Sequence, residues 1–252
     1  MTLTWPRALM LALQLLVPAL ILGFGLMALR VAAAPRRGER TLVWFMAGVA
    51  YTLDGGLALL HGVAATIAFF VPGTPLFRAY LALTPPANDA RNLLVLGFAA
   101  GLGWVLLLRR PAPSGRTMVA VALGLMAVGF VAGFAEPPLE QQHGDHLSVI
   151  SLAGAATAVL FFASLYRGMV RESVDWLLWI ALALYAAQEA LSSNIQTVLA
   201  WAGFGGAWAP RVDSMMWAGL VSAAVMVACS VRRLAIARAG GEAPGLIERL
   251  RG

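Results

Sequence analysis

Seven long apolar segments, bounded by charges, prolines or glycines, set what this chain can fold into. They cover residues 8–29, 42–70, 92–108, 117–135, 147–166, 176–200 and 214–231. A helix needs about 20 apolar residues to cross a bilayer, and most of these segments reach or approach that length. Only 12% of the residues are charged, against about 25% in soluble domains. The sequence therefore predicts an all-α integral membrane bundle of seven transmembrane helices.

The connections between these segments are short, which leaves no room for a soluble domain. We expect one transmembrane domain over residues 1–231, followed by a short basic cytoplasmic tail at 232–252. In that tail arginines alternate with Leu and Ile, which is typical of segments lying on a membrane surface. A partly ordered tail is the alternative. The first segment is longer than the apolar core of a signal peptide, so we interpret it as a span, with cleavage as the alternative.

The positions of the basic residues predict the orientation. All 18 are arginines, and with seven spans they divide 14 to 4 between the two sides of the membrane. The first side carries Arg30, Arg36, Arg37, Arg40, Arg109, Arg110, Arg116, Arg167, Arg171, Arg232, Arg233, Arg238, Arg249 and Arg251, and the other carries Arg7, Arg78, Arg91 and Arg211. The positive-inside rule then places the N-terminus outside and the C-terminus in the cytoplasm. We expect a bacterial inner membrane, with lipid headgroups rather than nucleic acid as partners of the arginines.

Two acidic residues are expected well inside the predicted spans, where each costs roughly 2.5–3.5 kcal/mol on insertion scales. Asp54 lies 14 residues after Arg40, and Glu189 lies 14 residues after Asp175. At about 1.5 Å per residue, both carboxylates would lie about 21 Å from the inner boundary. No arginine is expected at that depth. If the two carboxylates face one another, they must share a proton or a cation.

Helical spacing extends each acid into a polar face. The candidate ligand- or proton-binding residues are Tyr51, Asp54 and His61 in the second span, and Tyr185, Glu189, Ser192 and Gln196 in the sixth. His61 lies about 10 Å along the helix from Asp54, so the two need partners elsewhere. These faces predict a polar cavity that opens outward. Hydrogen bonds that only fix the helix packing are the alternative.

A second candidate site lies in the sequence "EPPLEQQHGDH", residues 136–146, between the fourth and fifth spans. Its side chains His143, Asp145 and His146 are of types that bind divalent metals. Their spacing matches no strong zinc signature, so a solvated acidic loop is the alternative. No catalytic residue is identified.

Glycines predict close contacts between helices. "GFAAG" at 97–101 and "GFVAG" at 129–133 each carry two glycines four residues apart, as at closely packed membrane helices. We expect packing within the bundle, with a dimer interface as the alternative. Gly55 and Gly56, which follow Asp54, leave space for a neighbouring helix or a ligand.

The layout of seven spans with an outside N-terminus resembles that of the microbial rhodopsins. The resemblance covers topology alone, and a retinal Schiff base requires a lysine, which the chain lacks. Covalently bound retinal is therefore excluded, and no other cofactor is identified. His61 is the one histidine expected inside a span, too few for a di-haem cytochrome or for the usual zinc-dependent membrane hydrolases.

Four functions remain open from the sequence. The first is a sensory or ligand-binding protein whose outward cavity takes a small molecule or ion and signals to a membrane or cytoplasmic protein. The second is a proton- or cation-coupled transporter that uses Asp54 and Glu189. The third is a membrane-embedded enzyme, which the absence of a catalytic motif disfavours. The fourth is an accessory subunit of a membrane complex.

Overall fold

The computed structural model describes residues 5–33, 39–108, 111, 113–135, 163–164, 178, 180, 182, 185 and 209–238. Within these residues the elements are α1 (Trp5–Ala32), α2 (Glu39–Phe70), α3 (Pro75–Leu102), the short π-helix η1 (Gly103–Leu107), α4 (Gly115–Gly133) and α7 (Ala209–Arg238), and none is a strand. The predicted all-helical class is confirmed for this part of the chain. Most of the predicted fifth and sixth spans lies outside the described residues.

In the part of the chain that the structure describes, four helical segments are long and apolar enough to cross a membrane. They are Ala8–Ala32, Leu42–Phe70, Gly115–Gly133 and Gly219–Ile236, in α1, α2, α4 and α7 respectively. They overlap the first, second, fourth and seventh segments predicted from the sequence. These four helices indicate that the protein associates with a membrane.

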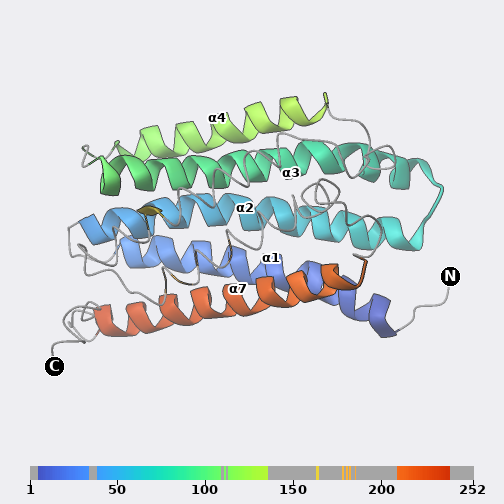
Figure 1. Cartoon of the computed structure of the whole chain (residues 1–252), viewed down its shortest axis with the longest axis horizontal. Coiled ribbons are helices and arrows are strands. Elements are labelled where there is room, and N and C mark those ends of the chain that lie inside the picture. The colour runs from blue at the N-terminus through green and yellow to red at the C-terminus, as the bar shows by residue number, and fades with distance from the viewer. Residues whose placement is uncertain are drawn as a thin grey trace, which may run out of the picture.

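The long helices lie side by side in the order α7, α1, α2, α3, α4 (Figure 1). Successive helices from α1 to α4 run in opposite directions, and α7 runs alongside α1. Both α2 and α4 pack against α3, whereas α2 and α4 make few contacts with each other. The described helices thus form a layer in which each helix has one or two main neighbours.

Three glycines of α2, spaced seven residues apart, form the contact with α1. A Cβ atom added at any of them would meet α1 at less than van der Waals distance, at Leu29 from Gly48, at Leu22 from Gly55 and at Gln14 from Gly62. Such small residues let helix backbones approach closely, and a repeat of seven fits two helices coiled around each other with a left-handed twist. The close approach expected at Gly55 is confirmed, and its occupant is α1. Gly56 has open space around it.

The two glycine pairs noted in the sequence also lie at helix contacts. Gly129 and Gly133 of α4 lie against the backbone of α3 at Asp89 and Pro86. Gly97 and Gly101 of α3 instead face side chains, from α4 and α2 respectively. Packing within the bundle is therefore confirmed for both pairs.

The start of α3 differs from the prediction. Residues 71–91 were expected to connect two spans, with the third span at 92–108, but the helix begins at Pro75. Thr74 caps it by accepting a hydrogen bond from the Phe77 amide at 3.3 Å. Proline fits the first turn of a helix because a backbone nitrogen there has no helical hydrogen-bond partner to lose. Pro85 and Pro86 lie inside α3, and both are buried against α4. Two prolines that would break an isolated helix are thus accommodated by packing against α4.

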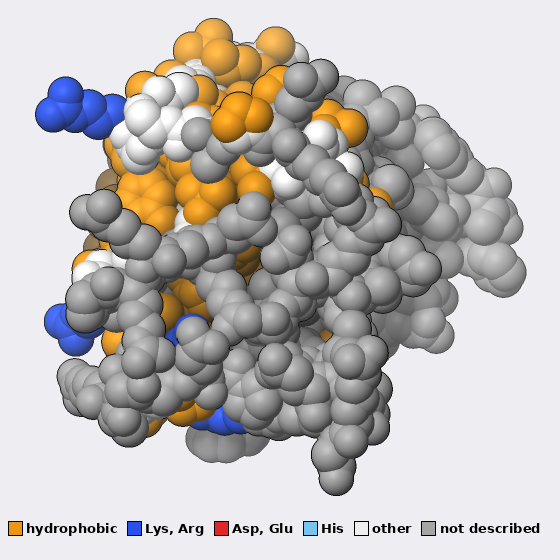
Figure 2. Space-filling view, turned by 90° about the vertical axis from the view of Figure 1, so that its left-hand side faces the viewer, with side chains coloured by type: hydrophobic (Ala, Val, Ile, Leu, Met, Phe, Trp, Pro, Cys, Tyr) orange, Lys and Arg blue, Asp and Glu red, His pale blue; other side chains and the backbone are white. Residues whose placement is uncertain are grey.

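Arginines gather at one end of the described helices. Arg30 lies in the last turn of α1, Arg116 in the first turn of α4, and Arg232 and Arg233 near the end of α7. These ends lie together at the left of Figure 1. Figure 2 views the molecule from that end, and its coloured side chains include arginines but no acids. The described part of the chain therefore has one distinctly basic end.

Candidate functional site

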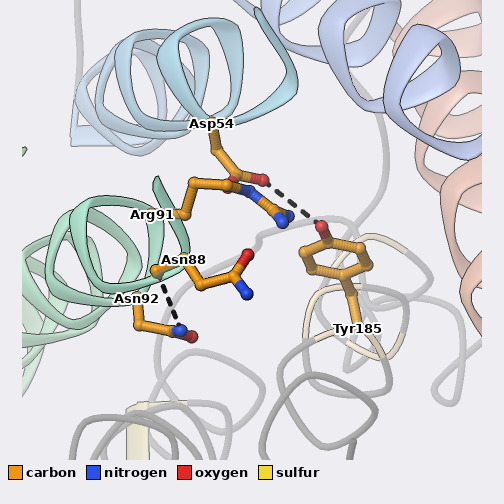
Figure 3. A network of polar contacts seen from close by, with 5 residues as sticks. All are labelled: Asp54, Asn88, Arg91, Asn92 and Tyr185. Carbon is orange, nitrogen blue, oxygen red and sulfur yellow. Dashed lines mark hydrogen bonds and ion pairs between the residues drawn. The ribbon is translucent and has the colours of Figure 1, made fainter. Parts of the chain in front are cut away.

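Asp54 lies near the middle of α2 and forms an ion pair with Arg91 of α3. The Arg91 Nε donates to Asp54 Oδ1 at 2.8 Å (Figure 3). The Asp54 side chain is only 1% exposed, and that of Arg91 is 19% exposed. The expectation that no arginine reaches Asp54 is wrong, because Arg91 was assigned to a loop and lies within α3. Each charge offsets the desolvation of the other in this apolar setting.

The second oxygen of the Asp54 carboxylate accepts a hydrogen bond from Tyr185. The Tyr185 hydroxyl donates to Asp54 Oδ2 at 3.3 Å, and Tyr185 is buried (Figure 3). Its ring packs edge-on against Tyr51, with ring centroids 5.7 Å apart. Tyr51 makes similar contacts with Phe24 at 5.4 Å and Phe98 at 5.5 Å. The structure therefore brings Tyr51, Asp54 and Tyr185 into one cluster that also joins α1 and α3.

His61 lies two helical turns from Asp54 and has a separate partner. Its Nε2 lies 3.2 Å from the hydroxyl of Tyr80 in α3. The two rings also pack edge to face, with centroids 5.2 Å apart. As expected, His61 and Asp54 make their contacts with different residues, and both of these partners belong to α3.

A cavity of about 230 Å³ connects the two pairs. Its polar lining comes from α1, α2 and α3 together with Tyr185, namely Gln14, His61, Tyr80, Asn88, Arg91 and Tyr185. Its apolar lining is Leu13, Val17, Pro18, Ala58 and Ala65, with Gly62 and Gly219 completing the described lining. In Figure 3 the Asn88 amide extends beside Arg91 toward Tyr185. The lining thus combines polar and apolar side chains, and both kinds come from α1 and α2.

Pro18 changes the backbone hydrogen bonding of α1 beside the cavity. It lies inside α1 and has no amide hydrogen, so the carbonyl of Gln14 cannot receive its usual bond from four residues ahead. That carbonyl lies where the missing side chain of Gly62 would be. A backbone acceptor therefore lies beside the cavity where α1 meets α2.

Sequence reasoning missed the contribution of α3 altogether. Tyr80, Thr84, Asn88 and Arg91 are spaced 4, 4 and 3 residues apart, the same spacing rule that marked the face around Tyr185. Pro85 and Pro86 obscure this face in the sequence, because proline breaks an isolated helix. Asp89, also in α3, is fully buried near α4. The expectation of only two buried acids is therefore wrong as well.

Several candidate residues lie outside the described residues. They are Glu189, Ser192 and Gln196 of the sixth predicted span, and His143, Asp145 and His146 of the loop. Their proposed roles stay predictions. Within the described part of the chain, no group of three His, Cys, Asp or Glu residues is placed to hold a metal ion.

Comparisons of the chain with protein-family models, curated proteins and solved structures give no significant match. The functional interpretation therefore depends on the chemistry of the cavity. Its features are the Asp54–Arg91 ion pair, the His61–Tyr80 pair two helical turns away, and apolar side chains from α1 and α2.

Proposed function

We propose that this protein is a seven-helix membrane receptor that binds a small organic anion in the cavity beside Arg91. The order α7, α1, α2, α3, α4 supports this count, since two further spans, predicted at 147–166 and 176–200, would close the bundle between α4 and α7. The basic end supports a cytoplasmic C-terminus and an outside N-terminus by the positive-inside rule. A bacterial inner membrane fits that arrangement.

The position of the cavity supports an outward opening. Its lining comes from the first half of α1, the second half of α2, the first part of α3 and Gly219 of α7. In Figure 1 these parts lie in the half of the molecule opposite the basic end. If the basic end faces the cytoplasm, the cavity belongs to the outer half of the membrane.

The hydrogen-bond donors that line the cavity are the observation that favours an anionic ligand. Arg91 donates only, and the Asn88 amide and the Tyr80 hydroxyl can donate, whereas the Tyr185 hydroxyl already donates to Asp54. Among the described residues that line the cavity none is Asp or Glu. A carboxylate on the ligand would meet these donors, and the apolar side chains of the lining would contact an apolar body. A dry cavity of roughly 150 Å³ holds benzene, so about 230 Å³ suits an aromatic or branched carboxylic acid.

The ion pair favours a binding protein over the cation-coupled transporter. A carrier of that type needs Asp54 to exchange a proton or cation during each cycle. Here Arg91 already compensates the Asp54 charge at 2.8 Å, and removing a partner from such a pair is costly. Asp54 therefore serves to hold Arg91 in place at the base of the cavity.

Helix α7 offers a route for the signal. Gly219 lines the cavity, and Arg232 lies 13 residues further along the same helix, or about 20 Å. A ligand that shifts α7 at the cavity would move the basic end, where a cytoplasmic or membrane protein would detect it. This step gives the partner expected for a sensory protein.

Cysteine labelling tests whether the cavity opens outward. The one native cysteine, Cys229, is buried and is replaced by serine. In that background, a membrane-impermeant thiol reagent is added to intact cells carrying His61→Cys or, as the control, Leu60→Cys. Leu60 is 70% exposed on the helix surface, so its thiol would lie in lipid at the same depth. We expect labelling of the first variant alone, whereas equal or absent labelling of both rejects an outward opening.

Thermal unfolding in detergent tests the ligand class. We expect benzoate and related small carboxylates to raise the melting temperature of the wild type, since a ligand of the folded state stabilises it. The neutral isostere benzamide should have a weaker effect, and Arg91→Gln should remove the response to benzoate. An equal effect of the two compounds, or no effect of any carboxylate, rejects an anionic ligand.

A further inference from the structure

A second concave site lies on another side of α3. Because α2 and α4 both pack against α3 but make few contacts with each other, a groove of about 160 Å³ remains between them. We call it the α2–α4 groove. Its described lining is almost entirely apolar and includes Met46, Phe98, Trp104, Val121 and Leu125, with Thr117 as the one hydroxyl side chain among these residues. The described lining residues of the groove and of the polar cavity do not overlap.

Two glycines of α3 leave the base of the groove without side chains that would fill it. Gly97 and Gly101 both line it, and they are one helical turn apart. A Cβ atom at Gly97 would collide with the Leu125 side chain, and one at Gly101 would collide with the methyl group of Met46. Side chains at these positions would therefore push the walls outward or fill the space between them.

The groove is open to the side. Trp104 and Val121 on its rim are 47% and 53% exposed, while Leu94 and Phe98 at its base are buried. The Trp104 indole donates to the carbonyl of Pro111 at 3.3 Å, which ties the rim to the segment that precedes α4. An open apolar groove on a helix long enough to cross a membrane faces lipid chains rather than water.

One end of the groove is polar and basic. Thr117 reaches the groove, and its hydroxyl lies 2.8 Å from that of Ser114. Arg116 lies between these residues in the sequence and is exposed. This is the basic end of the described helices, so a negatively charged headgroup is favoured there. An apolar trough with an exposed arginine next to Thr117 in the first turn of α4 matches the two parts of a phospholipid.

We propose that the α2–α4 groove holds one acyl chain of an anionic phospholipid, with the phosphate at Arg116 and the hydroxyls of Ser114 and Thr117. The proposal requires that the helices lie in a membrane, but not that the polar cavity binds a ligand. The lipid would fill the space between α2 and α4 and thereby hold α4 against the rest of the bundle.

Native mass spectrometry of the full chain in detergent tests this with two lipids of the same acyl chains. We expect the wild type to retain phosphatidylglycerol more strongly than phosphatidylcholine. Arg116→Gln should weaken the retention of phosphatidylglycerol about fivefold, as expected for one basic contact, and leave phosphatidylcholine nearly unchanged. Equal retention of the two lipids by the wild type overturns the assignment of an anionic headgroup.

A matched pair of variants tests the acyl chain. Val121→Trp fills the groove, whereas Val128→Trp places the same side chain elsewhere on α4, at a residue that is 60% exposed. We expect the first to lose bound lipid at least severalfold and the second to keep it. Thr117→Phe, at an exposed groove position, repeats the test if Val121→Trp does not fold. Unchanged lipid retention in the groove variants, or a change in oligomeric mass instead, overturns the proposal.

Discussion

The two sides of α2 meet their neighbours in opposite ways. Toward α1, Gly48, Gly55 and Gly62 let the two backbones almost touch. Toward α3, Asp54 and His61 form hydrogen bonds with the long side chains of Arg91 and Tyr80. Each set has a repeat of seven residues, and the two are offset by one position. One helix thus carries a close-packed seam and a polar face at the same levels along its length.

The two faces should respond differently to change. The seam has no space, so any added atom must move a backbone. The polar face borders a cavity, and Arg91 compensates the charge of Asp54, so this face should tolerate changes that preserve the balance of charge. Rigidity toward α1 combined with adaptability toward α3 is what a binding site needs if it is to hold its shape and still respond to a ligand.

The largest effect is expected from breaking the ion pair. Arg91→Leu leaves the Asp54 carboxylate without its cation in a buried setting, which should lower the free energy of unfolding by about 3–5 kcal/mol. Asp54→Leu should have a similar effect. The double variant Asp54→Leu/Arg91→Leu should recover most of the loss, because no uncompensated charge remains. Denaturant unfolding in micelles provides the double-mutant cycle, and additive losses would contradict a coupled pair.

A smaller effect is expected at the seam. Gly55→Ala inserts a methyl group against the backbone of Leu22 and should cost about 1–3 kcal/mol in unfolding free energy. Gly56→Ala is the matched control, since its Cβ has open space around it and alanine favours the helix by about 1 kcal/mol. The same unfolding assay measures both. Equal stability of the two variants would show that the helices are not in close contact at Gly55.

Loss of the Tyr185 hydroxyl should matter less again. Tyr185→Phe removes the donor to Asp54 Oδ2 but keeps the aromatic contact with Tyr51. Because Arg91 still compensates the carboxylate, we expect a loss of about 1 kcal/mol. In the Arg91→Leu background the hydroxyl becomes the main donor to Asp54, so removing it there should cost more. A cost that is independent of Arg91 would place Tyr185 outside the network.

The sequence predicted the apolar helices well and their polar neighbour poorly. Ala8–Ala32 and Leu42–Phe70 follow the predicted 8–29 and 42–70 closely, since long uncharged runs have few alternatives in a membrane protein. α3 does not contain such a long uncharged run, because Asn88, Asp89 and Arg91 lie within it and lower its mean hydropathy. A helix surrounded by other helices can carry such residues if they find partners.

The candidate site was located from one side only. The insertion cost of a charge singled out Asp54, and its spacing from His61 gave the face of α2. Their partners depend on how far α3 extends and which of its faces meets α2. Pro85 and Pro86 obscured both, because proline breaks an isolated helix but is accommodated here by packing against α4. Arg91 and Tyr80 are therefore identified as partners only by tertiary contacts, which no local sequence pattern records.

The smallest effect on stability is expected at Tyr80. A variant of this residue distinguishes a role in ligand binding from a role in helix packing. Tyr80→Phe removes the hydrogen bond to His61 from side chains that are only partly buried, so the free energy of unfolding should change by less than about 0.5 kcal/mol. If the cavity binds a carboxylate, the variant should still weaken benzoate binding, because it loses a donor and frees the His61 ring. Val63→Ala, at an exposed position on α2, controls for general effects. Thermal shifts measured over a range of benzoate concentrations distinguish the outcomes. A variant that loses stability without losing affinity would show that the pair only fastens α2 to α3.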